Sequence, residues 1–112
     1  MTEKQRFEIQ IPDSITIGAI PIQIKHGKKW DKRCNEERRY GAFFGDIENG
    51  RTIYMHSKQQ PADLSSTFIH ELLEAIRGTH DMQITHTNVC TLANGLHQIF
   101  EELGITFVNN KE

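Results

Sequence analysis

The spacing of apolar residues changes once along this 112-residue chain, close to Pro61. Before that point apolar and polar residues alternate, as in Phe7–Ile11, which is the period of a β-strand with one buried face. After it, apolar residues recur every three or four positions, which is typical of amphipathic helices. A chain of this length makes one ordinary domain. The pattern therefore predicts a single α+β domain over residues 1–112, with antiparallel N-terminal strands and a hairpin followed by two helices.

The strands are marked by runs of alternating apolar residues bounded by turn residues. They are expected over residues 7–11, 15–24, 40–47 and 51–55, with a short final strand over 105–108. The strands 40–47 and 51–55 are predicted to form a hairpin, because Asn49 and Gly50 tolerate the positive φ angles of a tight turn. Gly41 and Gly45 in the first hairpin strand indicate a bulge or a close approach of another part of the chain.

The segment 25–39 is dominated by charge. It holds seven Lys and Arg residues against three acidic residues, which leaves a net charge of +4. We predict a solvated loop around Trp30, with a nucleic-acid or partner-binding patch as the alternative. Because the whole chain has a formal charge of −2, nucleic-acid binding over its whole surface is not expected.

Two helices are predicted in the second half. The first begins at Pro61, has Asp63 in its first turn and ends near Gly78. The second runs from about Thr85 to Leu103, with Gly104 as its cap. Its apolar stripe consists of Val89, Leu92, Ala93, Leu96, Ile99, Phe100 and Leu103. Both helices therefore have one face available for packing.

The overall composition is that of a folded protein outside the membrane. Hydrophobic residues make up 37% of the chain and charged residues 25%, which excludes a disordered protein. No apolar stretch is long enough for a membrane span or a signal peptide, so we expect a cytoplasmic protein. Cys34 and Cys90 are too few for a disulfide framework and are expected to be free thiols.

The first predicted helix contains the pattern H-E-x-x-E, formed by His70, Glu71 and Glu74. Residues four apart lie above one another on a helix face, so His70 and Glu74 are spaced like the two ligands of the zinc-peptidase motif H-E-x-x-H. In that motif the Glu after the first His acts as general base, which is the role expected for Glu71. A solvated helix surface would place the same three residues together, so the pattern alone leaves that alternative open.

A second histidine would complete a ligand set of two His and one Glu. His80 lies ten residues after His70, and His86 lies sixteen residues after it at the start of the second helix. His86 borders the apolar stripe of that helix, so it is expected to point toward the first helix. The spacing therefore favours His86 and keeps His80 as the alternative.

Other residues have weaker patterns of the same kind. His86 and Cys90 are four apart on one helix face, with His97 on the same side, and such a pair could bind metal. Cys90 is more often a small residue at the edge of a core. Tyr54, His56 and His97 are candidate donors to a substrate carbonyl, but each is better explained as a strand or helix surface residue.

The chain resembles the small zinc metallopeptidases of phages and prophages, which are distant relatives of the ImmA/IrrE type. The resemblance rests on Ile20–Ile24, Tyr40-Gly41, Asp46-Ile47, Arg51–Tyr54, Thr67–Ile76 and Gly95–Phe100. It implies a zincin-like minimal metallopeptidase domain with Zn²⁺ as cofactor. It also implies a peptide or protein substrate in the cytoplasm of the host cell. The order of hairpin and helix predicts an edge strand (51–57) beside such a metal, where an extended peptide could add as a further strand.

The resemblance also implies a ligand set. Relatives of this type have either H-E-x-x-H with an acidic residue at the start of the next helix, or H-E-x-x-E with a histidine there. This chain is similar to the second form, which implies His70, Glu74 and His86 as Zn²⁺ ligands and Glu71 as the catalytic residue. A metal-binding or regulatory module without peptidase activity is the alternative function.

Overall fold

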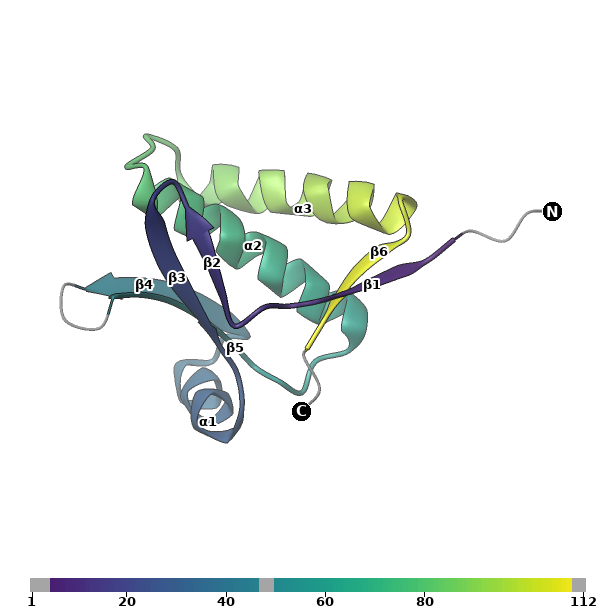
Figure 1. Ribbon diagram of the computed structural model, residues 1–112, viewed down its shortest axis with the longest axis horizontal. Coiled ribbons are helices and arrows are strands. Elements are labelled where there is room, and N and C mark those ends of the chain that lie inside the picture. Colours follow the sequence, from purple (N-terminus) through teal and green to yellow (C-terminus); the bar gives the residue numbers. More distant parts are fainter. Residues whose placement is uncertain (1–4, 47–49, 110–112) are drawn as a thin grey trace.

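The computed structural model describes residues 5–46 and 50–109 of the chain. The sequence predicted an α+β fold with strands in the first half and two long helices in the second, and this is confirmed. In chain order the elements are β1 (Phe7–Gln10), β2 (Ser14–Ile17), β3 (Ile20–Lys25), α1 (Lys28–Glu37), β4 (Gly41–Asp46), β5 (Gly50–Met55), α2 (Pro61–Thr79), α3 (His86–Glu102) and β6 (Ile105–Val108) (Figure 1). Of the predicted hairpin turn, residues 47–49 lie outside the described residues, and Gly50 has the expected positive φ of 73°.

The main sheet has four strands in the order β2-β3-β5-β4. β4 pairs with β5 in antiparallel fashion, as predicted. The single strand expected over 15–24 is wrong, because the chain turns at Gly18, which has a φ of 61°, and forms the antiparallel pair β2–β3. The central pair β3–β5 is parallel, with Ile24 opposite Ile53, so the prediction of purely antiparallel N-terminal strands is wrong. The reason is that the chain leaves β3 through α1 and turns back through β4, so that β5 enters the sheet in the direction of β3.

The first and last strands form a separate parallel pair. β1 pairs with β6, from Phe7 opposite Ile105 to Gln10 opposite Val108, so the predicted C-terminal strand is confirmed. The backbone N–H of Phe7 donates to the carbonyl of Gly104 at 2.7 Å. Gly104 has a φ of 78°, which lets the chain turn sharply between α3 and β6. This pair therefore joins the beginning of the described chain to its end.

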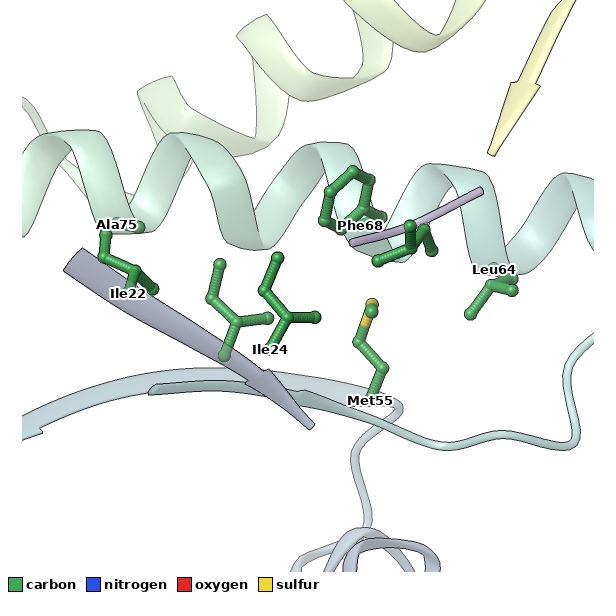
Figure 2. Close-up of a cluster of buried hydrophobic side chains, with 8 residues drawn as sticks. Ile22, Ile24, Met55, Leu64, Phe68 and Ala75 are labelled. Carbon is green, nitrogen blue, oxygen red and sulfur yellow. The ribbon is translucent and has the colours of Figure 1, made fainter. Parts of the chain in front are cut away.

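Helix α2 lies between the main sheet and α3, and α1 covers the opposite face of the sheet (Figure 1). The main core lies between α2 and the sheet and consists of Ile11, Ile22, Ile24, Ile53, Met55, Leu64, Phe68 and Ala75. Figure 2 shows the strand residues Ile22, Ile24 and Met55 directed toward Phe68 and Ala75 on α2. The alternation along the strands therefore gives one face of the sheet to α2.

The charged segment between β3 and β4 is a helix, so the prediction of a solvated loop is wrong. Helix α1 docks through Trp30 and Cys34, which lie one turn apart, and Cys34 is fully buried. Trp30 stacks on Tyr54 with ring centroids 5.1 Å apart, and the Tyr54 hydroxyl donates to the carboxylate of Glu37. Two apolar residues suffice here because they meet a large ring on the strand, a pairing that charge counting along the segment does not reveal.

A second set of contacts holds α1 against the end of β5. The backbone N–H and hydroxyl of Ser57 donate to the Asp31 carboxylate at 2.7 and 2.5 Å. Burial alone would raise the pKa of Asp31, but these hydrogen bonds and the nearby charge of His56 outweigh it and hold this pKa below its ordinary value. His56 also contacts Asn35, with Nε2 3.1 Å from Oδ1. His56 therefore belongs to the attachment of α1.

Helix α3 begins where the sequence predicts. Thr85 and Asn88 cap it reciprocally, each side chain bonding the backbone N–H of the other residue. Of the predicted apolar stripe, Val89 and Ala93 are buried against α2, whereas Leu92, Ile99 and Leu103 are exposed. Packing against α2 therefore buries only part of the apolar stripe of α3. Among the described residues, no helix is both long and apolar enough to cross a membrane.

Replacement of Gly41 by Ala is expected to destabilise the fold by about 1–3 kcal/mol through overpacking. A Cβ at this position would lie 2.8 Å from Cγ2 of Thr67, where α2 crosses the start of β4. Urea unfolding measures the loss, and the double variant with Thr67→Ser should recover part of it. Gly45→Ala is the matched control, because its Cβ would meet the flexible side chain of Arg51 instead. Equal losses at Gly41 and Gly45 would contradict this explanation.

Tyr54→Phe is expected to weaken the attachment of α1 in a pH-dependent way. Burial and the hydrogen bond to Glu37 raise the pKa of Tyr54 to about 12. The hydroxyl therefore contributes stability below its unfolded pKa of 10.0, and this contribution is lost as the pH rises toward 12. Unfolding free energies should show Tyr54→Phe below the wild type at pH 7, with the gap narrowing above pH 10. Tyr40→Phe, at an exposed position, is the control, and a gap that stays constant would contradict the prediction.

Candidate metal centre

The three residues of the H-E-x-x-E pattern lie near the middle of α2 and are largely buried. The side chain of His70 is 23% exposed and that of Glu74 is 14% exposed, while Glu71 as a whole is 7% exposed. A charged helix face in contact with solvent would be far more exposed. The explanation of these residues as an ordinary solvated surface is therefore wrong.

His86 joins this group from the first turn of α3. Its Nδ1 lies 2.7 Å from Oε2 of Glu74, and Nε2 of His70 lies 3.7 Å from the same oxygen. The rings of His70 and His86 meet edge to face, with centroids 5.2 Å apart. The structure thus brings together the three residues that the resemblance implies as Zn²⁺ ligands.

His80, the alternative ligand, lies elsewhere. It caps the C-terminus of α2, where its backbone N–H donates to the carbonyl of Ile76 at 3.0 Å. Its ring faces the turn between β2 and β3, since Cε1 lies 3.4 Å from where a Cβ on Gly18 would be. Of the two histidines that the spacing left open, the structure places His86 with His70.

A cysteine completes the cluster. Sγ of Cys90 lies 3.5 Å from Nε2 of His86, one turn along α3. One donor atom from each of His70, His86 and Cys90 can be chosen so that all three lie within 4.8 Å of one another. The sequence indicated the pair of His86 and Cys90 but could not show that His70 faces both.

Burial sets the protonation of two residues in the cluster. It raises the pKa of Glu71 to about 7, with the charge of Glu74 adding to the effect and Arg39 opposing it. Burial also lowers the pKa of His70, and although Glu74 opposes this change, His86 and Arg77 add to it. Near neutral pH, His70 is thus a neutral imidazole able to bind metal, and Glu71 can both accept and release a proton.

Two cavities border the cluster and share Gly41, His70 and Glu71. The larger has a volume of about 550 Å³ and is lined by Glu37, Arg38, Arg39, Gly41, Ala42, Phe43, His70, Glu71, Glu74, Arg77, Gly78 and His86. The smaller, of about 320 Å³, is lined by Tyr40, Gly41, Ser66, Thr67, His70, Glu71, Cys90, Ala93 and Asn94. The cluster is therefore accessible from both spaces.

The edge strand beside these residues is not the predicted one. The segment 51–57 falls largely on β5, which lies inside the sheet between β3 and β4. The outer strand next to β5 is β4, and its first residues Gly41, Ala42 and Phe43 line the larger cavity. The sequence could not settle this order, because it depends on the parallel pairing of β3 with β5.

The three candidate donors to a substrate carbonyl are not part of the cluster. Tyr54 is fully buried toward α1, and His56 contacts Asp31 and Asn35 there. His97 lies 3.9 Å from Glu101 on α3. None of the three lines either cavity. The prediction that they are surface residues is wrong for Tyr54, because it is buried where α1 is fastened to β5. His56 belongs to the same attachment.

Arg77 is a site residue that sequence reasoning did not assign. Its Nη2 lies 2.7 Å from Oε1 of Glu74, and its Nη1 donates to the carbonyl of Ile84 at 3.2 Å. Arg77 thereby ties Glu74 to the loop that leads into His86. Its position three residues after Glu74 on one helix face was the available signal.

Glu71→Gln is expected to stabilise the metal-free protein at alkaline pH. A folded pKa of about 7 against the ordinary 4.5 means that the wild type loses stability as the pH rises from 4.5 to 7. The loss is roughly 3 kcal/mol at most, and Gln cannot undergo it. Unfolding free energies at pH 5 and pH 8 in the presence of chelator test this, with Glu102→Gln as the control for an exposed carboxylate. Parallel pH profiles for wild type and Glu71→Gln would contradict the prediction.

Comparison with protein-family models, with curated proteins and with solved structures finds no match for this chain. The resemblance to phage-type zinc metallopeptidases therefore stays a prediction.

Proposed function

We propose that this protein is a zinc-dependent peptide hydrolase with Glu71 as its general base. The observation that carries the proposal is the burial of Glu71 beside His70, Glu74 and His86 at the wall of one cavity. Burying a carboxylate on a helix is unfavourable, so it is expected mainly where the group has a chemical task.

The residues present fit a zinc ion. Two imidazoles and a carboxylate are donor types that zinc binds, and three protein ligands leave the fourth position open, as in catalytic sites. Oε1 of Glu74 is buried without an aligned hydrogen-bond donor, although Arg77 lies close to it. His70 and His86 would hold the metal, with Glu74 as the third ligand that the resemblance implies. When bound, Zn²⁺ would lower the pKa of a water molecule and polarise a substrate carbonyl.

Proton transfer and the positioning of the ligands would be carried out by side chains of this protein. Glu71 would take a proton from the attacking water and deliver it to the leaving amine, for which a pKa near 7 is well suited. Arg77 would keep Glu74 and the loop before His86 in place. These roles are supported by the burial of Glu71, by the contact of Arg77 with Glu74 and by the cavity that both glutamates line.

The position of β4 suggests how a peptide would lie. Its outer edge is not paired with another strand of the described sheet, and its first residues line the larger cavity with His70 and Glu71. An extended peptide could pair with this edge as an added strand, which would bring one of its carbonyls beside the metal. Arg38 and Arg39 at the same cavity would favour peptides with acidic side chains.

The proposal predicts that metal binding and turnover can be separated by two variants. His70→Ala should lose zinc, whereas Glu71→Gln should retain one zinc per chain and lose peptide cleavage by roughly 10²- to 10⁴-fold. Metal analysis and cleavage of a peptide library rich in acidic residues measure the two effects. His80→Ala is the matched control, because it removes a histidine that faces the turn between β2 and β3.

Two outcomes would contradict the proposal. A wild-type protein that takes up no zinc would exclude a metal centre of this kind. Zinc at one equivalent with no cleavage of any peptide would exclude the hydrolase and favour the alternative, a metal-binding or regulatory module.

A further inference from the structure

The protonation of His86 follows from its contact with Glu74. An ionised carboxylate only accepts hydrogen bonds, so the nitrogen that lies 2.7 Å from Oε2 must carry the proton. That nitrogen is Nδ1. In the neutral imidazole the lone pair is then on Nε2, which is the nitrogen that faces Cys90.

The contact between Glu74 and His86 is of the kind that commonly orients a metal-binding histidine. In protein metal sites the imidazole usually binds through one nitrogen and donates its other N–H to a carboxylate, which fixes the tautomer and the ring orientation. Nδ1 of His86 and Glu74 have this relation without any rearrangement. Glu74 is therefore placed to orient His86, and the metal-binding nitrogen is then Nε2.

From these contacts we propose that Cys90 is the third protein ligand of the metal, together with His70 and His86. The inference rests on the proposed metal centre and changes one part of it, because Glu74 becomes a positioning residue instead of a ligand. The three ligands would still leave one position open for the hydrolytic reaction.

The distances support this set. Ligand atoms around a tetrahedral zinc, with bonds of about 2.0–2.3 Å, lie about 3.3–3.8 Å from one another. Sγ of Cys90 is already 3.5 Å from Nε2 of His86. One donor atom from each of the three residues can also be chosen so that all three lie within 4.8 Å of one another.

Cys90 is also accessible to a metal ion. It is half-buried and lines the smaller cavity next to His70 and Glu71. On binding, the thiol would give up its proton to solvent and the sulfur would form the bond to the metal. A thiolate beside two imidazoles favours zinc over magnesium, calcium or manganese, which prefer oxygen ligands. The proposal therefore also specifies the class of metal.

X-ray absorption at the zinc edge of the zinc-loaded protein tests the assignment directly. We expect one sulfur at about 2.3 Å in addition to nitrogen or oxygen neighbours at about 2.0–2.1 Å. Cys90→Ser should lose the sulfur, whereas Cys34→Ala should keep it, because Cys34 is buried on α1. Glu74→Gln should also keep the sulfur and weaken zinc binding by roughly 10- to 100-fold, as expected for loss of a group that orients a ligand.

A second measurement uses the unmodified chain and so does not depend on the folding of a variant. Zinc should protect Cys90 of the wild type from alkylation by iodoacetamide, read by mass spectrometry of the peptide that contains it. Zinc bound without sulfur and without protection of Cys90 would overturn this inference and leave Glu74 as the ligand, with the proposed hydrolase intact. Failure of the wild type to bind zinc at all would overturn both.

Discussion

Helix α2 is covered on two sides, and most of the structure depends on this. Its apolar side packs on the main sheet through Phe68 and Ala75. Its polar side faces the start of α3 and the first residues of β4, which line a cavity together with it. The first contact supplies hydrophobic stabilisation and holds the helix at a fixed position over the strands. The second takes His70, Glu71 and Glu74 out of bulk water. The packing that secures the helix therefore also creates the conditions that change the pKa values of Glu71 and His70.

The connection from α2 to α3 decides which histidine reaches the cluster. Arg77 contacts Glu74 on one side and the carbonyl of Ile84 on the other, and the cap at Thr85 starts α3 one residue before His86. His86 thus enters the cluster from a helix whose beginning is fixed by two sets of hydrogen bonds. His80 lies before this connection and turns toward the sheet instead.

The parts that sequence predicted are those set by local pattern. The H-E-x-x-E spacing on one helix, the start of α3 and the approach of His86 all follow from helical periodicity. The parts it missed depend on contacts between distant segments. The docking of α1 depends on Trp30 meeting Tyr54, and the choice of β4 as outer strand depends on β5 pairing with β3. Neither contact can be predicted from the residues that neighbour it in the sequence.

The position of Cys90 next to the cluster is also set by a contact between distant segments. Considered alone on α3, Cys90 is a small residue beside an apolar stripe, and its spacing from His86 indicates a possible metal-binding pair without showing a third ligand. The contact of Glu74 with Nδ1 of His86 makes Cys90 a candidate ligand, because it leaves Nε2 of His86 free and directed toward the sulfur. The H-E-x-x-E pattern draws attention to Glu74 as a ligand, yet the carboxylate at this distance from an imidazole already has a hydrogen-bond partner. In the proposed metal centre, the nitrogen of His86 that binds the metal therefore determines whether the third ligand is a carboxylate or a thiolate.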